Sequence, residues 1–178
     1  FFLWDVYVRT CFMRKIEQDE VYGITCSFPE QFDPRSRFWK DPILLQIPRE
    51  EIAAVAFAYP SGQFDIQVMD SVWMVGSGND RVRANITLVQ DMLKSMELLV
   101  ARDFPTKVQK AELDFSKPDI TVTIVTKPDS QYASSFLLVL EDDDGGYWGK
   151  TSDSPYVYYF LDRDINKVLL TREALESR

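Results

Sequence analysis

Alternation of apolar with mostly polar residues, interrupted by tight turns, is the feature that most constrains this sequence. Phe64, Ile66 and Val68 alternate with the residues between them, which is typical of a strand with one buried face. An apolar run at 52–59 precedes them and another at 72–75 follows, with turn residues on both sides. Strands joined by such short turns pair antiparallel, so we expect a β-meander over residues 52–75.

The apolar period changes from two to 3.6 after Gly76–Asp80, which we expect to be a loop. Asn85 is a suitable helix N-cap, because its side chain can accept a hydrogen bond from the first free N–H groups. Apolar residues then fall at helical spacing across 86–102, namely Val89, Met92, Leu93, Met96 and Leu99. Pro105 ends this main helix region, and residues 108–115 predict a short second helix.

A second set of apolar segments after Pro118 predicts a second meander. Its strands are expected at 120–126, 136–140, 147–150 and 157–160. Residues 161–170 follow with helical spacing and predict a closing helix. Together these patterns predict an α+β fold of antiparallel β-meanders, with one main helix packed on a sheet and a short closing helix.

The first part of the sequence predicts a separate β-hairpin over residues 6–27, because two strand-like segments flank a polar run at 17–20. With the turn near Gln18, Cys11 and Cys26 face the same side, about one residue pair out of register. A disulfide between them is conceivable, but the spacing does not require it. A proline-containing loop follows, up to Pro42.

The two ends of the sequence resemble each other. Val21-Tyr22-Gly23-Ile24 and Val157-Tyr158-Tyr159-Phe160 both follow a polar turn, at an offset of 157 − 21 = 136 residues. This offset is far longer than the period of solenoid repeats. We therefore expect residues 1–42 to be the closing hairpin and loop of a preceding unit, and residues 43–178 to be one complete α+β unit. An orphaned hairpin exposes an edge strand, which offers a route to a homodimer.

Histidine is absent from the 178 residues. Its absence excludes Ser-His-Asp and Cys-His catalysis, HExxH zinc sites and histidine pH switches. Two cysteines are too few for a four-thiolate zinc site. The formal net charge is 20 − 28 = −8 and the basic residues are scattered, which argues against nucleic acid as a partner.

Two loop motifs invite a ligand and are better explained as turns. Gly76–Arg81 has two glycines of a dinucleotide-binding fingerprint, but Arg81 replaces the third and the preceding strand belongs to a meander. We interpret it as a plain strand-to-helix loop. Glu141–Gly146 gathers acidic residues, yet it lacks the spacing of an EF-hand loop and fits a hairpin turn. We expect no metal, no cofactor and no catalytic residues.

Aromatic residues near the C-terminal end form the one candidate ligand or partner surface. It comprises Trp148, Tyr156, Tyr158 and Tyr159. Exposed aromatic rings would suit a carbohydrate- or peptide-binding module, although aromatic residues are equally favoured in strands and cores. Asn85-Ile86-Thr87 is also a glycosylation sequon, which we interpret structurally because Asn85 fits the N-cap.

Several packing motifs together resemble a known bacterial family. They begin at Phe38-Trp39-Lys40-Asp41-Pro42-Ile43-Leu44-Leu45 and continue through Glu51–Val55 and the turn at Gly62. The strand ending in Val72-Trp73-Met74-Val75 and the Ala84-Asn85 step before the helix follow. This order is similar to domain-of-unknown-function family 4340, over about residues 20–178. Lys40 stands where that family commonly has Arg, and Asn85 where it commonly has Asp.

The resemblance implies a role at the cell envelope. Members of that family are extracytoplasmic, are anchored by an N-terminal membrane segment, often carry tandem units and are often encoded beside gliding-type ABC transporter components. We therefore expect a non-enzymatic accessory domain with a protein partner in the envelope. The longest apolar run has eight residues, far short of the ~20 of a membrane helix. Since the sequence opens on Phe1, we expect the anchor to lie in a segment that precedes it.

Overall fold

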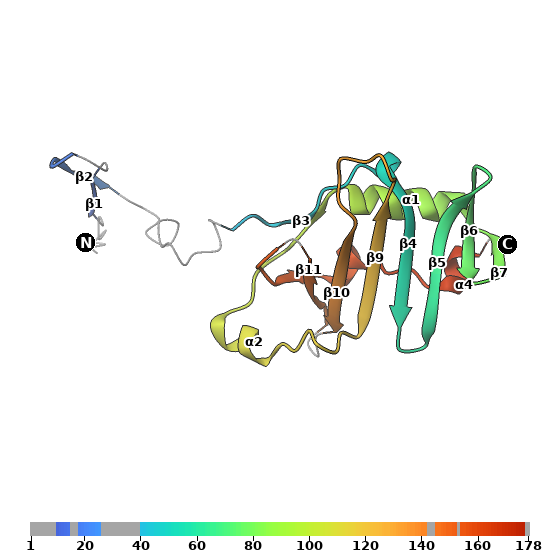
Figure 1. The fold of residues 1–178 in the computed structure, drawn as a ribbon. Coiled ribbons are helices and arrows are strands. Elements are labelled where there is room, and N and C mark those ends of the chain that lie inside the picture. The colour runs from blue at the N-terminus through green and yellow to red at the C-terminus, as the bar shows by residue number, and fades with distance from the viewer. Residues whose placement is uncertain (1–9, 15–17, 26–39, 142–144, 153, 177–178) are drawn as a thin grey trace, which may run out of the picture. The chain divides into compact units, whose positions relative to one another are not determined.

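The computed structural model describes residues 10–14, 18–25, 40–141, 145–152 and 154–176. The chain divides into two compact units, Phe1–Asp41 and Pro42–Arg178. Both are drawn in Figure 1. The assignment of the first unit to a preceding copy of the fold is a separate matter and stays a prediction.

The first unit contains an antiparallel hairpin of β1 (Thr10–Arg14) and β2 (Val21–Thr25). The predicted hairpin is thus confirmed over its described residues. Its side chains Phe12, Val21 and Tyr22 are exposed. Cys26 and most of the predicted loop lie outside the described residues, so the disulfide also stays a prediction.

Eight antiparallel strands form the sheet of the second unit. In chain order they are β4 (Ile52–Tyr59), β5 (Gly62–Met69), β6 (Val72–Ser77), β7 (Asp80–Arg83), β9 (Ile120–Thr126), β10 (Ser135–Glu141), β11 (Tyr147–Thr151) and β12 (Tyr158–Phe160). Across the sheet the order is β12-β11-β10-β9-β4-β5-β6-β7 (Figure 1). Two meanders therefore meet where β4 pairs with β9, and the predicted α+β class is confirmed.

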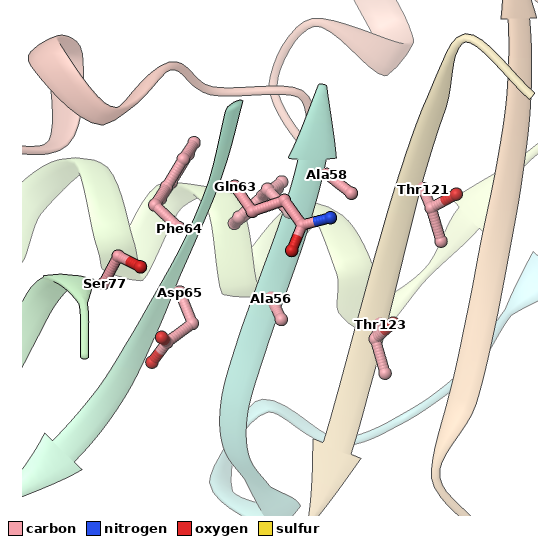
Figure 2. A pocket seen from close by; sticks show the side chains of 9 residues that line it. Ala56, Ala58, Gln63, Phe64, Asp65, Ser77, Thr121 and Thr123 are labelled. Atoms are coloured by element: carbon pink, nitrogen blue, oxygen red, sulfur yellow. The ribbon is translucent and has the colours of Figure 1, made fainter. Parts of the chain in front are cut away.

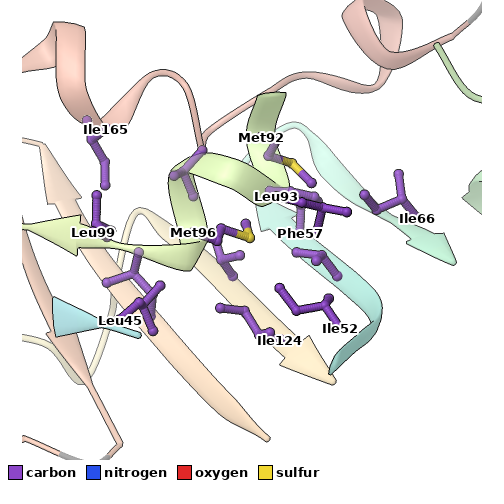
Figure 3. Packing of buried hydrophobic residues seen from close by; sticks show 14 of the residues in the cluster. Leu45, Ile52, Phe57, Ile66, Met92, Leu93, Met96, Leu99, Ile124 and Ile165 are labelled. Carbon is purple, nitrogen blue, oxygen red and sulfur yellow. The ribbon is translucent and has the colours of Figure 1, made fainter. Parts of the chain in front are cut away.

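Helix α1 (Ile86–Glu97) covers one face of this sheet. Asn85 is its N-cap, as predicted, and its side chain accepts a hydrogen bond from the backbone N–H of Leu88 at 3.3 Å. Figure 3 shows side chains of α1 directed at the apolar side chains of the sheet. The helix residues buried in this core are Val89, Met92, Leu93 and Met96. Burial of side chains of this size stabilises a fold by about 1.5–3 kcal/mol each.

The main helix is shorter than predicted, because it ends at Glu97 and not at residue 102. Leu98 has extended backbone at the C-cap, and Leu99–Val100 form a short strand, β8, paired with β3 (Ile43–Leu45). Leu99 is buried, as its helical spacing indicated, but it reaches the core from the strand. A helix and a strand can both bury this position, so the periodicity alone could not place the helix end.

Two further predictions need correction. Residues 76–80 are a hairpin turn, because β6 continues to Ser77 and the charged segment Asp80–Arg83 forms the edge strand β7. Of the expected closing helix at 161–170 only one turn is helical, α3 (Asp162–Ile165), and a second short helix, α4 (Arg172–Leu175), lies beyond the predicted range. The predicted second helix is α2 (Lys107–Glu112), which ends three residues early, and η3 (Arg49–Glu51) is a short 3-10 helix before β4.

The closing segment is held against the rest of the unit by specific hydrogen bonds. The Tyr59 hydroxyl donates to the carbonyl oxygen of Leu170 at 3.0 Å, and the N–H of Asn85 donates to that of Leu175 at 2.7 Å. Arg172 pairs with Asp80 of β7 at 2.6 Å. Ile165, Val168 and Leu175 are all buried in the same core as α1 (Figure 3 labels Ile165). Residues far apart in the sequence therefore close one core.

Replacement of the helix N-cap provides a first test. Asn85→Ala removes the acceptor for the Leu88 N–H, and we expect it to lower the free energy of unfolding by about 1 kcal/mol. Asn85→Asp keeps an acceptor oxygen and should lose much less. Urea unfolding followed by circular dichroism measures both variants, and equal losses for the two would contradict the capping role.

The pH dependence of stability tests the buried tyrosine. Burial, with a smaller contribution from Tyr147, raises the pKa of Tyr59 to about 12 from 10.0. The folded protein holds this proton more tightly than the unfolded chain does, so the stabilisation is complete below pH 10 and is lost as the pH rises from 10 to 12. We expect Tyr59→Phe to flatten the fall in unfolding free energy over this interval, and equal slopes for the two proteins would contradict the prediction.

Candidate functional site

The two faces of the sheet differ in what covers them. In the described part of the second unit, α1 lies against one face, and no helix lies over the central strands on the other (Figure 1). We call the second face the open face. Thr123, Val125 and Phe136 are exposed there, although they belong to strands whose alternate residues are fully buried. The open face is therefore solvent-accessible surface on a rigid sheet.

Residues of the open face stand in register across six strands. The central row runs from β10 to β7 as Phe136, Thr123, Ala56, Asp65, Gly76 and Arg81. The row changes from an apolar aromatic end to a charged end, with small side chains between them. This gradient follows directly from the antiparallel register, because directly opposed residues lie side by side.

Small side chains hollow the middle of the open face. Ala56 and Ala58 of β4 lie beside Thr121 and Thr123 of β9, while bulkier residues flank them (Figure 2). The result is a shallow depression of about 340 Å³. Its lining comprises Ala56, Phe57, Ala58, Gln63, Phe64, Asp65, Ser77, Thr121 and Thr123. Charged groups are confined to one side of it, at Asp65.

Asp65 is held by a bidentate ion pair. The Arg81 Nη1 and Nη2 atoms donate to its two carboxylate oxygens, each at 2.8 Å, and Nε donates to the carbonyl oxygen of Gly78 at 3.0 Å. The hydrogen bonding of Arg81 to Asp65 is the main reason why the pKa of Arg81 is raised above its ordinary value. Two-point pairing of this kind fixes the orientation of both side chains.

Gly76 makes this ion pair possible. It lies between Asp65 and Arg81 in register, so the Arg81 side chain crosses β6 over a position without a side chain. A Cβ at Gly76 would also collide with the carbonyl oxygen of Asp80. Gly76, which resembles the first glycine of a dinucleotide-binding fingerprint in the sequence, thus has a structural role in the β6–β7 hairpin.

The four aromatic residues predicted as a surface do not form one platform. Trp148 and Tyr159 are cross-strand partners with ring centroids 4.7 Å apart, and Trp148 is only 7% exposed. Tyr158 points to the opposite face and is 2% exposed, with its hydroxyl 2.7 Å from Ser154 Oγ. Tyr156 is exposed and contacts Tyr158 edge-on. Burial leaves Trp148 and Tyr158 little surface for a ligand.

Two grooves beside α1 are alternative sites. One of about 600 Å³ is lined by residues of α1 and of the segment after α3, including Lys94 and Lys167. Another of about 700 Å³ lies between α1 and the segment before η3, and Lys94 borders it too. Charged lysines border these grooves, whereas small uncharged side chains occupy the centre of the open face. Interface centres are depleted in charge, which favours the open face.

The acidic run Glu141–Gly146 is only partly described by the structure. Asp142–Asp144 lie outside the described residues, and in the remainder no group of three Cys, Asp or Glu side chains is placed to hold a metal ion. Nor is any helix in the described ranges long and apolar enough to cross a membrane.

No family model matches the chain, and neither the curated proteins nor the solved structures give a match. The open face was not predicted from the sequence, because the side chains at its centre are small and form no motif. Its signal was the alternation of alanine with bulky residues in Ile52–Tyr59, opposite threonines of β9.

Substitution of Gly76 tests the arrangement of this face. Gly76→Ala is expected to lower the free energy of unfolding by at least about 2 kcal/mol, because the new methyl group meets backbone that cannot move aside. Gly78→Ala is the matched control, since nothing lies within 4 Å of a Cβ there and only its left-handed backbone (φ +56°) is strained, at a cost of about 1 kcal/mol. Denaturant unfolding should rank the two in this order, and the reverse order would contradict it.

Proposed function

We propose that residues 42–178 form a non-enzymatic interaction domain whose open face binds a protein partner. The observation that carries this proposal is the in-register row from Phe136 to Arg81, which combines an exposed aromatic ring with an oriented ion pair. Exposed apolar surface on a rigid scaffold is typical of protein interaction sites. The apolar residues exposed on this face are Met69, Val125 and Phe136.

The geometry of the face suits a protein segment. The small residues at Ala56, Ala58 and Thr123 let a partner approach the sheet backbone, and the flanking bulkier residues would contact it on both sides. Arg81 and Asp65 at the charged end would fix its orientation, because a bidentate pair offers a defined set of polar atoms. An aromatic ring such as Phe136 is a typical anchor of an interface.

The biological setting of the proposal comes from the sequence. The similarity to family 4340 supports an extracytoplasmic, membrane-associated role beside an ABC transporter. The alternative, a carbohydrate- or peptide-binding module, would rely on Trp148, Tyr156, Tyr158 and Tyr159. Burial of Trp148 and Tyr158 weakens support for that alternative.

A charged substitution on the open face tests the proposal. Thr123→Arg places a long cation over the depression without replacing a buried residue, and Gln90→Arg adds the same side chain at an exposed position of α1. We expect affinity capture from the native envelope to enrich ABC transporter subunits with the unmodified domain and with Gln90→Arg. Thr123→Arg should reduce their recovery at least about tenfold.

Mass spectrometry of the captured material and thermal melting of each variant provide the measurements. Equal recovery with Thr123→Arg and the unmodified domain, at unchanged melting temperature, would exclude the open face as the binding surface. Saturable binding to cell-wall glycans that Tyr156→Ala abolishes would support the alternative module.

A further inference from the structure

The β1–β2 hairpin of the first unit and the β11–β12 hairpin of the second have the same register. Adding 136 to the pair Cys11↔Ile24 gives Tyr147↔Phe160, and adding it to Phe12↔Gly23 gives Trp148↔Tyr159. Met13↔Tyr22 likewise becomes Gly149↔Tyr158. All three pairs observed between β11 and β12 are thus reproduced by the offset found between Val21 and Val157 in the sequence. A shift of one residue in either strand would break every match.

The side chains match at the same offset. An aromatic residue stands at Phe12 and Trp148, and a basic residue at Arg14 and Lys150. Valine, tyrosine and a large apolar residue occupy the equivalent positions of the second strands, which are Val21, Tyr22 and Ile24 against Val157, Tyr158 and Phe160. The register agrees without a gap and the residue type agrees at these five positions, whereas Cys11, Met13 and Gly23 differ in type from Tyr147, Gly149 and Tyr159.

Equivalent residues differ sharply in burial. Phe12 is 75% exposed and Trp148 only 7%; Tyr22 is 52% exposed and Tyr158 only 2%. Val21 and Val157 differ in the same way, at 59% and 6%. In the second unit Tyr158 is part of the core, whereas Trp148 lies on the opposite face of the hairpin, against the ring of Tyr159. Among the described residues of the first unit, Phe12, Val21 and Tyr22 have no comparable cover.

We infer that β1–β2 is the closing hairpin of a second copy of this fold, encoded before residue 10 in the same polypeptide, and that this preceding unit covers Phe12, Val21 and Tyr22. A two-stranded hairpin alone is marginally stable in water, so it requires such a partner. The matched register specifies this partner. A strand equivalent to β10 should pair with β1, and the equivalent of the second unit's core should pack against Tyr22. This inference is independent of the partner proposed for the open face.

The polypeptide sequence upstream of this segment gives the first test. Shifting by 136 residues should place an alternating apolar strand at the equivalent of Ile52–Tyr59 and an N-capped amphipathic helix at the equivalent of Ile86–Glu97. Upstream sequence without these elements at this spacing would overturn the inference.

Hydrogen exchange on the protein gives the second test. In the 178-residue chain, the amides of β1 and β2 should exchange quickly, and in the longer natural polypeptide at least about 100-fold more slowly. Rapid exchange in both would overturn the inference. Protection that increases with the concentration of the 178-residue chain would assign the cover to a second molecule and would also overturn it.

Matched substitutions separate this inference from a general effect on folding. Phe12→Asp should leave the melting temperature of the 178-residue chain unchanged and lower one transition of the longer polypeptide by several degrees. Trp148→Asp, at the equivalent position, should lower the melting temperature of both proteins. If Phe12→Asp had no effect on the longer polypeptide, the Phe12 side chain would not be covered there, and the inference would fail.

Discussion

Pairing of β4 with β9 is the interaction on which the second unit depends. Each strand belongs to its own four-stranded meander, and their antiparallel contact joins the two into one sheet. Val55 lies opposite Ile124 and Phe57 opposite Val122, and all four side chains are buried. The two strands are separated in sequence by the elements β5, β6, β7, α1, β8 and α2, so their contact must close a long stretch of chain. Such non-local pairing has a large entropic cost of closure, which the core under α1 offsets.

The same pairing creates the open face. Side chains alternate between the two faces along β4 and β9. Because Val55 and Ile124 point toward α1, their neighbours Ala56 and Thr123 lie on the other face. In the described part of the second unit, α1 is the one helix longer than six residues, and it covers one face of the eight strands. The other face carries small residues in the centre, an aromatic side chain at one end and the Asp65–Arg81 pair at the other. Its accessibility and its composition thus have a common origin in the strand register.

Local patterns predicted most of the elements. The ranges of β4 and β9 agree with the predicted 52–59 and 120–126, because turn residues bound the apolar segments, with Pro60-Ser61-Gly62 after β4 and Pro118 before β9. The N-cap at Asn85 was also predicted, since its function depends on neighbours within one helical turn. The edge strand β7 was missed because Asp80, Arg81 and Arg83 resemble loop residues, and only pairing with β6 makes them a strand. The helix end at Glu97 was missed because Leu99 is buried in either conformation.

The sequence by itself determined where most strands of the sheet form and where the main helix begins, the class of fold, and the repetition of a hairpin pattern at an offset of 136 residues. Those properties depend on side chains close together in the chain. Tertiary structure decided which side chains are covered. Trp148 and Tyr158 are buried although both looked suitable for a surface, and the equivalent Phe12 and Tyr22 are exposed. Burial depends on what the rest of the fold places against a residue, and the same tyrosine in the same register is therefore core in one hairpin and surface in the other.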